Sequence, residues 1–425
     1  MAETSGFLAP TENVVQDEFD PALEAAFAFE ETCKELDLEG EIVQRLRHPE
    51  RELTVHLPLA VHGGQALAFS GMRVQHNTTR GPAMGPVSLG PSLHLAQLKA
   101  RAMSGTWQCA LLDLPFGGAA GGVVCDPARL SESELRHLVK AYVRALHGVI
   151  GPFRDVLTPE AGLNARIMAW MADGYAQACR HTEPGAVTGK PSALAGLSDD
   201  LAQHYLFFLL REILEQRQQP ILGQRIVIDG VTTGSLVAVD LLSQAGARIL
   251  AISDVSGALF NDQGLSIDDV TSYAAQNGML FGYPSAESIS SADLLQTPCD
   301  ILILAGSERS IALPNAAPIQ AHVVVEAAPC VLTVAAAKEL ALRGVNIIPE
   351  LLAGAGTMLA SFFEWSKNVR NTHWSSAELD RQLQGRAQTA YREVLETAAR
   401  HSTTARHAAH LLAIGRVAEA LRLRR

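Results

Sequence analysis

The chain lacks the features that mark exported, membrane-spanning and metal-binding proteins. Its six cysteines are scattered over 425 residues, without a CxxC pair or the spacing of metal ligands. No apolar run reaches the roughly 18 residues that suggest a membrane-spanning helix, and the acidic N-terminus has no apolar core like that of a signal peptide. We therefore expect a soluble cytoplasmic protein with reduced, mostly buried thiols and no metal site.

Charged residues are also scarce. They make up 19% of the chain, below the usual share of about a quarter, and the net charge is −11. A negatively charged chain repels nucleic acids and anionic membranes, so we expect neither as a partner. Few charges and many apolar residues favour large buried interfaces and hence an oligomer, although large cores alone would give the same composition.

The N-terminal half has the pattern of a mixed α/β domain. Residues 1–20 resemble a flexible tail, and the spacing of apolar residues after them predicts a helix, two alternating strands and a long second helix. The stretch "LPFGGAAGG" (114–122) then predicts a glycine-rich turn leading into a strand, since glycine permits positive φ and close backbone contact. Ser131 and Glu134 form the capping box of a further amphipathic helix.

The C-terminal half alternates strands and helices. After the break at "TGKPSALAG" a long helix is expected, followed by the strands of "QRIVIDG", "ARILAISD", "DILILAG", "AHVVVEAA" and "VNIIPELLAG". This order is typical of a doubly wound domain. From "SFFEWSKN" onward the chain has the pattern of helices to its end.

The first strand–turn–helix of this domain carries a degraded dinucleotide fingerprint. "GVTTGS" keeps Gly230 and Gly234 but places Thr232 and Ser235 where the GxGxxG pattern has glycines, with Thr233 between. A β-branched residue at the position of closest approach should obstruct a pyrophosphate. Asp254, after the next strand, is either a ligand of a ribose hydroxyl or a residue of the turn. We therefore expect no cofactor requirement and doubtful NAD(P) binding.

Several long motifs occur in the order found in the glutamate/leucine/phenylalanine/valine dehydrogenases, and the chain resembles that family from about residue 20 to its end. They are "GMRVQHNTTRGP", "TWQCALLDLPFGGAAGG", "VTGKP", "AISDVSG", "FFEWSKN" and "GRVAEA". The resemblance implies an α/β fold in which an N-terminal domain assembles a hexamer and lines the substrate cleft. A Rossmann-like nucleotide domain follows, and C-terminal helices return to the first domain. The expected divisions are 1–20, 21–192, 193–355 and 356–425.

The same resemblance implies that the catalytic groups are lost. In active glutamate dehydrogenases one lysine grips the side-chain carboxylate, a second grips the α-carboxylate, and a third in GGxKGG polarises the reacting carbon with an aspartate as proton relay. Here these positions are Met84, Gln108, Ala120 and Glu160. Losing a general acid or base lowers a rate by about 10²–10⁴, and each lost charge-assisted contact costs about 1.5–3 kcal/mol. Met84 alone would suit an apolar substrate, but relatives acting on such substrates keep the other two lysines.

Other positions of the family are also changed or are open to a structural reading. The asparagine of EGAN becomes Pro329, and NAGG appears as "GAGT" (354–357). Ser361 matches a substrate-contacting serine but could instead cap its helix. Lys190 is expected to be a hinge or ion-pair lysine rather than a substitute base. We expect structural roles for the residues of a segment that shapes the cleft and the subunit contact in the family. These residues are Arg73, His76, Asn77 and Arg80.

The first hypothesis is a catalytically inactive glutamate dehydrogenase paralogue. It would act as the regulatory subunit of a hetero-hexamer with an active homologue and confer allosteric control by an amino acid such as leucine. A second hypothesis is an active NAD(P)-dependent amino-acid dehydrogenase that uses Glu160 or Lys190, and a third is a ligand sensor or scaffold. The effector could bind in the degenerate cleft of Met84, Gln108 and Ser361 or in a pocket between subunits, and the sequence does not decide between them; the nucleotide site around Gly230 is degenerate as well.

Overall fold

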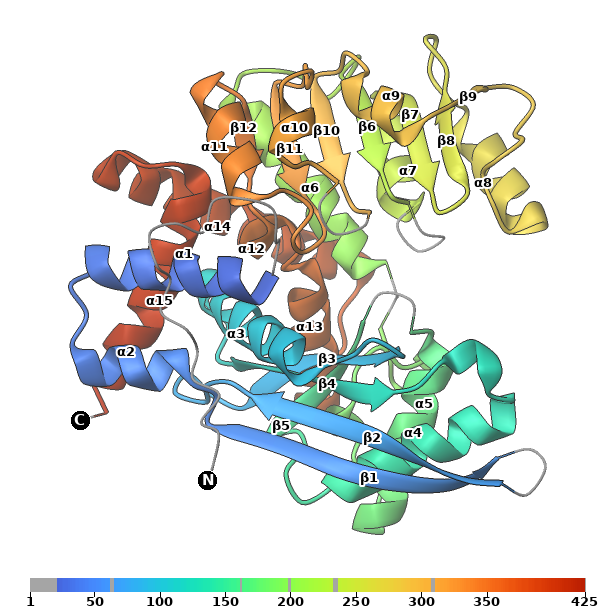
Figure 1. Ribbon diagram of the computed structural model, residues 1–425, viewed down its shortest axis with the longest axis vertical. Coiled ribbons are helices and arrows are strands. Elements are labelled where there is room, and N and C mark those ends of the chain that lie inside the picture. The colour runs from blue at the N-terminus through green and yellow to red at the C-terminus, as the bar shows by residue number, and fades with distance from the viewer. Residues whose placement is uncertain are drawn as a thin grey trace.

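The chain folds into two lobes, each built on its own β-sheet (Figure 1). The computed structural model describes residues 21–61, 65–160, 163–197, 200–231, 236–306 and 310–424, so the predicted tail, residues 1–20, lies outside them. Across these ranges no helix is both long and apolar enough to cross a bilayer.

The first lobe contains a five-stranded sheet of order β1-β2-β4-β3-β5. β1 and β2 are the two alternating strands that the sequence predicts, and they pair antiparallel over their whole length. β4 pairs antiparallel with β2 and parallel with β3, and β3 pairs parallel with β5. The strands are β1 (Arg51–Val61), β2 (Gln65–Gln75), β3 (Ala83–Gly90), β4 (Gly117–Val124) and β5 (Asp155–Pro159).

Helices cover both faces of this sheet (Figure 1). α3 (Leu95–Leu111) packs on β4, and α4 (Glu132–Leu146) packs on the opposite face beside α5 (Ala165–Cys179). The predicted capping box is present, since Ser131 accepts from the backbone of Glu134 and the Glu134 side chain accepts in return. A short 3₁₀ turn, Pro127–Arg129, lies between β4 and α4, and two more follow α5: Pro184–Ala186 and Ser192–Leu194.

The prediction of a glycine-rich turn at 114–122 is wrong, because residues 117–124 form strand β4 in the middle of the sheet. The four glycines of this strand have no positive φ. A Cβ on Gly118 would lie 2.1 Å from the carbonyl oxygen of Ala102 in α3, and one on Gly122 would lie 2.1 Å from that of Ser88. Glycine is therefore required here because neighbouring backbones contact the strand directly.

The second lobe contains a seven-stranded sheet of order β12-β11-β10-β6-β7-β8-β9. β6, β7, β10, β11 and β12 are parallel neighbours, which confirms the predicted doubly wound domain. The antiparallel edge of β8 and β9 was not predicted. The strands are β6 (Arg225–Asp229), β7 (Arg248–Asp254), β8 (Gly257–Phe260), β9 (Glu287–Ile289), β10 (Ile301–Leu304), β11 (Val323–Glu326) and β12 (Asn346–Ile348).

Helices of the second lobe flank this sheet, and α6 enters the lobe from the first one (Figure 1). Short apolar strands such as β10 and β11 are fully buried between these helices, as is typical of parallel sheets. The helices are α6 (Leu201–Gln216), α7 (Leu236–Gln244), α8 (Ile267–Asn277), α9 (Ser291–Gln296), α10 (Leu313–Ala316), α11 (Val334–Leu342) and α12 (Glu350–Ala353).

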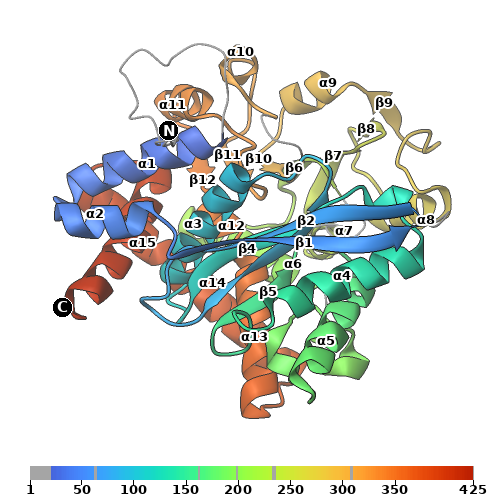
Figure 2. The same ribbon diagram turned by 60° about the horizontal axis from the view of Figure 1, so that its bottom comes forward.

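The C-terminal helices return to the first lobe, where α15 packs beside the N-terminal pair (Figure 2). Trp365 donates its indole N–H to the carbonyl of Pro152 at 2.7 Å, and Arg416 donates to that of Leu111 at 2.9 Å. The elements are α1 (Pro21–Glu35), α2 (Gly40–Arg47), α13 (Gly356–Arg370), α14 (Ser376–His401) and α15 (Ala405–Arg422).

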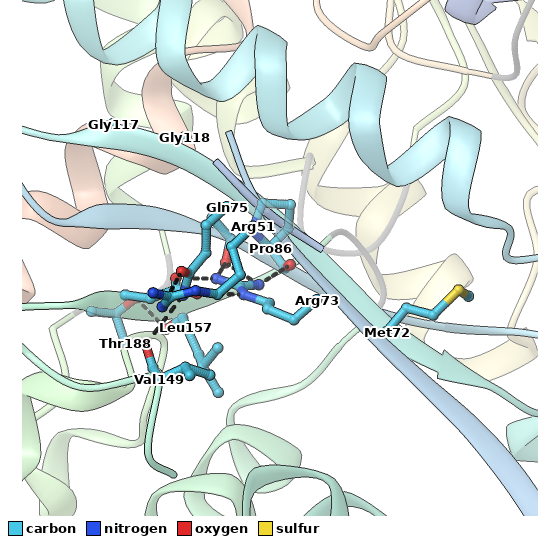
Figure 3. Close-up of polar contacts among 12 residues, drawn as sticks. Arg51, Met72, Arg73, Gln75, Pro86, Gly117, Gly118, Val149, Leu157 and Thr188 are labelled. Carbon is cyan, nitrogen blue, oxygen red and sulfur yellow. Dashed lines mark hydrogen bonds and ion pairs between the residues drawn. The ribbon is translucent and has the colours of Figure 1, made fainter. Parts of the chain in front are cut away.

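A buried ion pair ties the first sheet together (Figure 3). Arg73 of β2 donates through Nε and Nη2 to the two carboxylate oxygens of Asp155 at 2.8 and 2.5 Å, and both side chains are fully buried. Arg73 also donates through Nη1 and Nη2 to the carbonyls of Gly85 and Pro86 in β3. Gln75 donates a further hydrogen bond to Asp155. Burial alone would lower the pKa of Arg73, but the charge of Asp155 outweighs it and raises that pKa.

We expect Arg73→Met to destabilise the chain strongly, since it leaves Asp155 buried without its cation. Breaking a buried pair costs about 3–5 kcal/mol, and urea unfolding followed by circular dichroism measures the loss. The exposed pair of Arg166 and Glu132 supplies the control, because Arg166→Met should cost less than about 1 kcal/mol. Similar losses in the two variants would contradict this role of Arg73.

Candidate active site

Ala120, the position where the resemblance implies a catalytic lysine, is sealed inside the first lobe. Its side chain is fully buried on the face of β4 beneath α3. It belongs to an apolar cluster with Met72, Val74, Leu98 and Ala102. A methyl group in this cluster offers neither a charge nor a hydrogen bond to a substrate.

Met84, the position of the lysine for the side-chain carboxylate, is also fully buried. It lies on β3 in register with Gly118 of β4 and Val156 of β5, and it packs in the largest apolar core. The position therefore serves packing and presents no cation.

Gln108, the position of the lysine for the α-carboxylate, is occupied by a contact across the two lobes. Its Nε2 donates to Oε1 of Glu350 at 2.6 Å, and Ser104 one turn earlier in α3 donates to Oε2 at 3.3 Å. Glu350 begins α12, which follows the last strand of the second sheet. Two side chains of α3 thus hold this carboxylate.

Glu160, the position of the proton-relaying acid, is held by an arginine. Nη1 of Arg101 lies 2.5 Å from its Oε1, and the hydroxyl of Ser88 donates to Oε2. Arg101 was missed in the sequence analysis, because a single arginine on a helix gives no sign of a partner 59 residues away. Both carboxylate oxygens of Glu160 thus have partners within the first lobe, which opposes a role as a free proton relay.

Lys190 and Ser361 occupy structural positions. Lys190 is buried and pairs with Glu364 of α13 at 2.6 Å, so it is an ion-pair lysine, as expected. Burial lowers the pKa of Lys190, and the Glu364 carboxylate opposes that effect. Ser361 is buried in the middle of α13, whose N-cap is Ala355, so the alternative that it caps the helix is wrong.

The segment with Arg73 also has structural contacts at its other residues. His76 is buried, with one ring nitrogen bonded to the hydroxyl of Thr106 and the other to the carbonyl of Leu46, each at 2.8 Å. Burial lowers the pKa of His76 to about 4, so the ring is neutral at physiological pH. Asn77 accepts from a backbone N–H two residues on, and Arg80 pairs with an aspartate after α3 at 2.6 Å.

The nucleotide edge lies where β6 and β10 are neighbours and the strand order reverses. In doubly wound sheets ligands bind at the carboxyl ends of strands at such a point. Gly230 follows β6 with φ of 87°, and a Cβ on it would lie 1.9 Å from Cα of Gly306, which follows β10. The rest of the predicted fingerprint lies outside the described residues: Thr232, Thr233, Gly234 and Ser235.

The carboxylate of Asp254 accepts hydrogen bonds from backbone N–H groups around its turn. Oδ1 accepts from the N–H of Ser256 at 2.7 Å, and Oδ2 accepts from the N–H of Leu280 at 2.9 Å. Of the two roles expected for Asp254, the turn is therefore the one seen. Pro329 follows β11, and residues 354–357 span the end of α12 and the start of α13.

Two carboxyl groups between the lobes have raised pKa values. Burial, and then the negative charge of Glu326, raise the pKa of Glu350 to about 7, against the hydrogen bonds from Ser104 and Gln108. Burial also raises the pKa of Glu326, and Arg406 opposes this. A neutral glutamine at 108 supplies a hydrogen bond but no charge to compensate this acidic pair.

Known proteins resemble this chain along nearly its whole length. The family model for glutamate/leucine/phenylalanine/valine dehydrogenase matches residues 205–425, and the dimerisation-domain model of the same family matches 49–177. A catabolic NAD-specific glutamate dehydrogenase of Bacillus subtilis is 34% identical over 396 residues, which is 93% of each chain. Glutamate dehydrogenase A2 of Halobacterium salinarum is 37% identical over 403 residues, covering 94% of this chain and 97% of its own.

A solved structure confirms the predicted fold. The hetero-hexameric glutamate dehydrogenase from Thermus thermophilus, in its leucine-bound form, matches with a TM-score of 0.91 at 33% identity. The match covers 97% of this chain and 99% of that chain. The arrangement of a mixed α/β domain, a Rossmann-like domain and returning C-terminal helices is therefore as expected.

The prediction that no cofactor is required and that NAD(P) binding is doubtful is wrong. The similar enzymes are nicotinamide-dependent, and the Bacillus subtilis relative is NAD-specific by name, so a nucleotide is expected to bind. The described residues fit this group, because Gly230 and Gly306 themselves have no side chains where the carboxyl ends of β6 and β10 meet. The prediction gave too much weight to Thr232, although backbone amides at a helix N-terminus hold phosphates without a complete glycine pattern.

Glu350→Gln should change how stability depends on pH. Because the folded-state pKa is raised from 4.5 to about 7, the folded chain holds a proton that the unfolded chain releases. The free energy of unfolding of the parent chain, which carries Glu350, therefore falls as pH rises from about 4.5 to about 7. Water in the adjoining cavity screens part of the effect, so the variant should gain on the order of 2 kcal/mol over the parent across this range. Urea midpoints from pH 4.5 to 8 test this.

The exposed Glu396→Gln is the control for that experiment, and it should follow the parent curve. Parallel curves for Glu350→Gln and the parent would contradict a raised pKa at Glu350.

Ala120→Lys should destabilise the chain by at least about 2 kcal/mol, because it overfills the cluster beneath α3 and buries an ammonium group. Thermal unfolding compares it with Ala128→Lys, which changes an exposed alanine in the same lobe and should be nearly neutral. If both variants melt with the parent, position 120 has access to a charged or solvated environment and its sealing is refuted.

Proposed function

The chain belongs to the glutamate/leucine/phenylalanine/valine dehydrogenase family, and we propose that it is a catalytically inactive member with a regulatory role. In this proposal it forms a hetero-oligomer with a catalytic glutamate dehydrogenase in the cytoplasm. It confers control by an amino acid such as leucine on the activity of its partner.

The burial of Ala120 is the observation that carries this proposal. A catalytic amine at this position would have to leave the apolar cluster of Met72, Leu98 and Ala102 to reach a substrate. The apolar side chains around the methyl group leave no polar partner for an ammonium group at this position.

The other family positions support the same proposal. Met84 is part of a core, and the side-chain amide of Gln108 donates a hydrogen bond to Glu350. The acid Glu160 is paired with Arg101. A bound nicotinamide nucleotide would supply a hydride acceptor, but none of these side chains provides a free cation to polarise the substrate or a free base to take its proton.

The assembly proposed here rests on a retained scaffold. The dimerisation-domain model matches residues 49–177, and the Thermus thermophilus protein is a hetero-hexamer with leucine bound. We propose the corresponding division of this chain, with residues 21–192 forming the assembly and cleft domain, 193–355 the nucleotide domain and 356–425 the returning helices.

The alternative, an active enzyme with altered catalytic residues, would need a substitute base. Lys190 is fixed by Glu364 and by the carbonyls of Pro184 and Val187, and Glu160 is fixed by Arg101. Either group would have to break a short ion pair before it could act, so the contacts favour the regulatory role.

Activity of the chain alone and with its partner tests the proposal. Alone, it should oxidise glutamate with NAD or NADP at least about 10²-fold more slowly than a catalytic homologue from the same cell. Co-expressed with that homologue, it should purify in one mixed assembly whose rate changes on addition of leucine. The homologue expressed alone is the control and should respond less.

Robust oxidation of any amino acid by the chain alone would overturn the inactive assignment. Separate elution of the two chains, or a mixed assembly that is indifferent to every proteinogenic amino acid, would overturn the regulatory one.

A further inference from the structure

A large cavity lies where the two lobes meet the terminal helices. Its volume is about 1180 Å³, and its walls come from α1, α3, α11, the start of α12 and the start of α15. α1 crosses in front of α3 and below α11 in Figure 1. The lining includes none of the family's catalytic positions, since Met84, Gln108, Ala120, Glu160 and Ser361 all lie elsewhere. The volume is ample for a small metabolite with accompanying water.

A buried acid and a cation with unused hydrogen-bonding capacity line this cavity. Within the described ranges, Oε1 of Glu326 and Nη1 of Arg406 are buried and have no hydrogen-bond partner. The two side chains contact each other through their other atoms, Oε2 and Nη2, at 3.4 Å. Buried polar atoms without partners are uncommon in folded proteins, so an acceptor and a donor are both left for a ligand.

A second carboxylate stands beside the first. Glu350 lines the same cavity, and its position is fixed by Ser104 and Gln108. Burial, and then repulsion by the charge of Glu326, disfavour the ionised form of Glu350. A ligand ammonium group between them would relieve this repulsion and receive charge-assisted hydrogen bonds.

Apolar side chains form the rest of the lining. Phe27 of α1, Met103 and Trp107 of α3, and Val334 of α11 all contribute. Lys338, also of α11, places its ammonium group 6.0 Å from the centre of the Phe27 ring. A branched hydrocarbon side chain would displace water from this surface.

We propose that this cavity is the effector site and that it binds a free α-amino acid with an apolar side chain, the ammonium group against Glu326 and Glu350 and the carboxylate against Arg406. The assignment of an amino acid as effector rests on the proposed function. The location rests on the cavity and on the unused donor and acceptor within it.

The position of the cavity gives the ligand a route to the rest of the molecule. Glu326 and α11 belong to the second lobe, whereas α3 belongs to the first, so an occupied cavity favours one arrangement of the lobes. α3 also carries Arg101, which lines the cavity and pairs with Glu160 at the former catalytic position. Ligand binding and cleft geometry are thereby linked through one helix.

Calorimetric titration of the full chain with L-leucine tests the site without any measurement of activity. Leucine should bind, and its two charge-deleted analogues, leucinamide and 4-methylpentanoate, should each bind about ten- to a hundredfold more weakly. Arg406→Gln should weaken leucine by a similar factor and should remove the difference between leucine and leucinamide. Leucine binding that is unchanged in Arg406→Gln would overturn the site.

A second variant, which blocks the cavity sterically, tests the location even if Arg406→Gln does not fold. Ala28→Trp, from α1, places a large side chain in the wall of the cavity, so it should abolish leucine binding while circular dichroism stays unchanged. Ala377→Trp, on an exposed turn of α14, is the matched control and should bind leucine like the parent. Full binding by Ala28→Trp would refute the location.

The same variants separate the site from the proposed function. If leucine alters the mixed assembly and Ala28→Trp does not change that response, the regulatory role stands and the site is wrong. If leucine binds in this cavity but leaves the mixed assembly unaffected, the site stands and the regulatory role is wrong.

Discussion

The backbone contact between α3 and β4 is the constraint on which the first lobe depends. A Cβ at Gly118 would lie 2.2 Å from the amide nitrogen of Thr106, so the helix and the strand meet without side chains between them. This contact sets the height of α3 above the sheet, and with it the reach of Gln108 toward Glu350 and of Arg101 toward Glu160. A larger residue at position 118 would lift the helix and disturb both contacts together.

Charge burial follows a consistent rule in this chain. Arg73 and Lys190 are buried cations, and each has a carboxylate within hydrogen-bonding distance and backbone carbonyls around it. At positions 84 and 120, where the family has lysines, the surroundings are apolar and sealed. An unpaired ammonium group there would cost far more than either ion pair. The apolar residues at these two positions are therefore the ones that their surroundings favour.

The sequence predicted the elements that depend on local pattern and missed the features that depend on distant partners. Periodicity and capping were enough for α4 and for the doubly wound order of the second lobe. The glycines of β4 were read as a turn, because the backbone that requires them, in α3, cannot be identified from neighbouring residues. Gln108 meets an acid 242 residues away and Arg101 one 59 residues away, and neither pairing leaves a local signal. The positions that correspond to the family's lysines could be assigned from the sequence because they lie inside long ordered motifs.

Glu350 connects position 108 to the proposed effector site. A lysine at position 108 would lie against this carboxylate, which the glutamine amide approaches at 2.6 Å, and would compensate its charge. The glutamine donates a hydrogen bond without a charge, so the pKa of Glu350 rises to about 7 beside a second buried acid, Glu326. Uncompensated buried carboxyl groups are costly to a fold, and this cost falls when a cation arrives from outside. An amino-acid effector would supply its ammonium group to the acid that a lysine at 108 would have neutralised, so position 108 of α3 and the proposed effector site meet at one carboxylate.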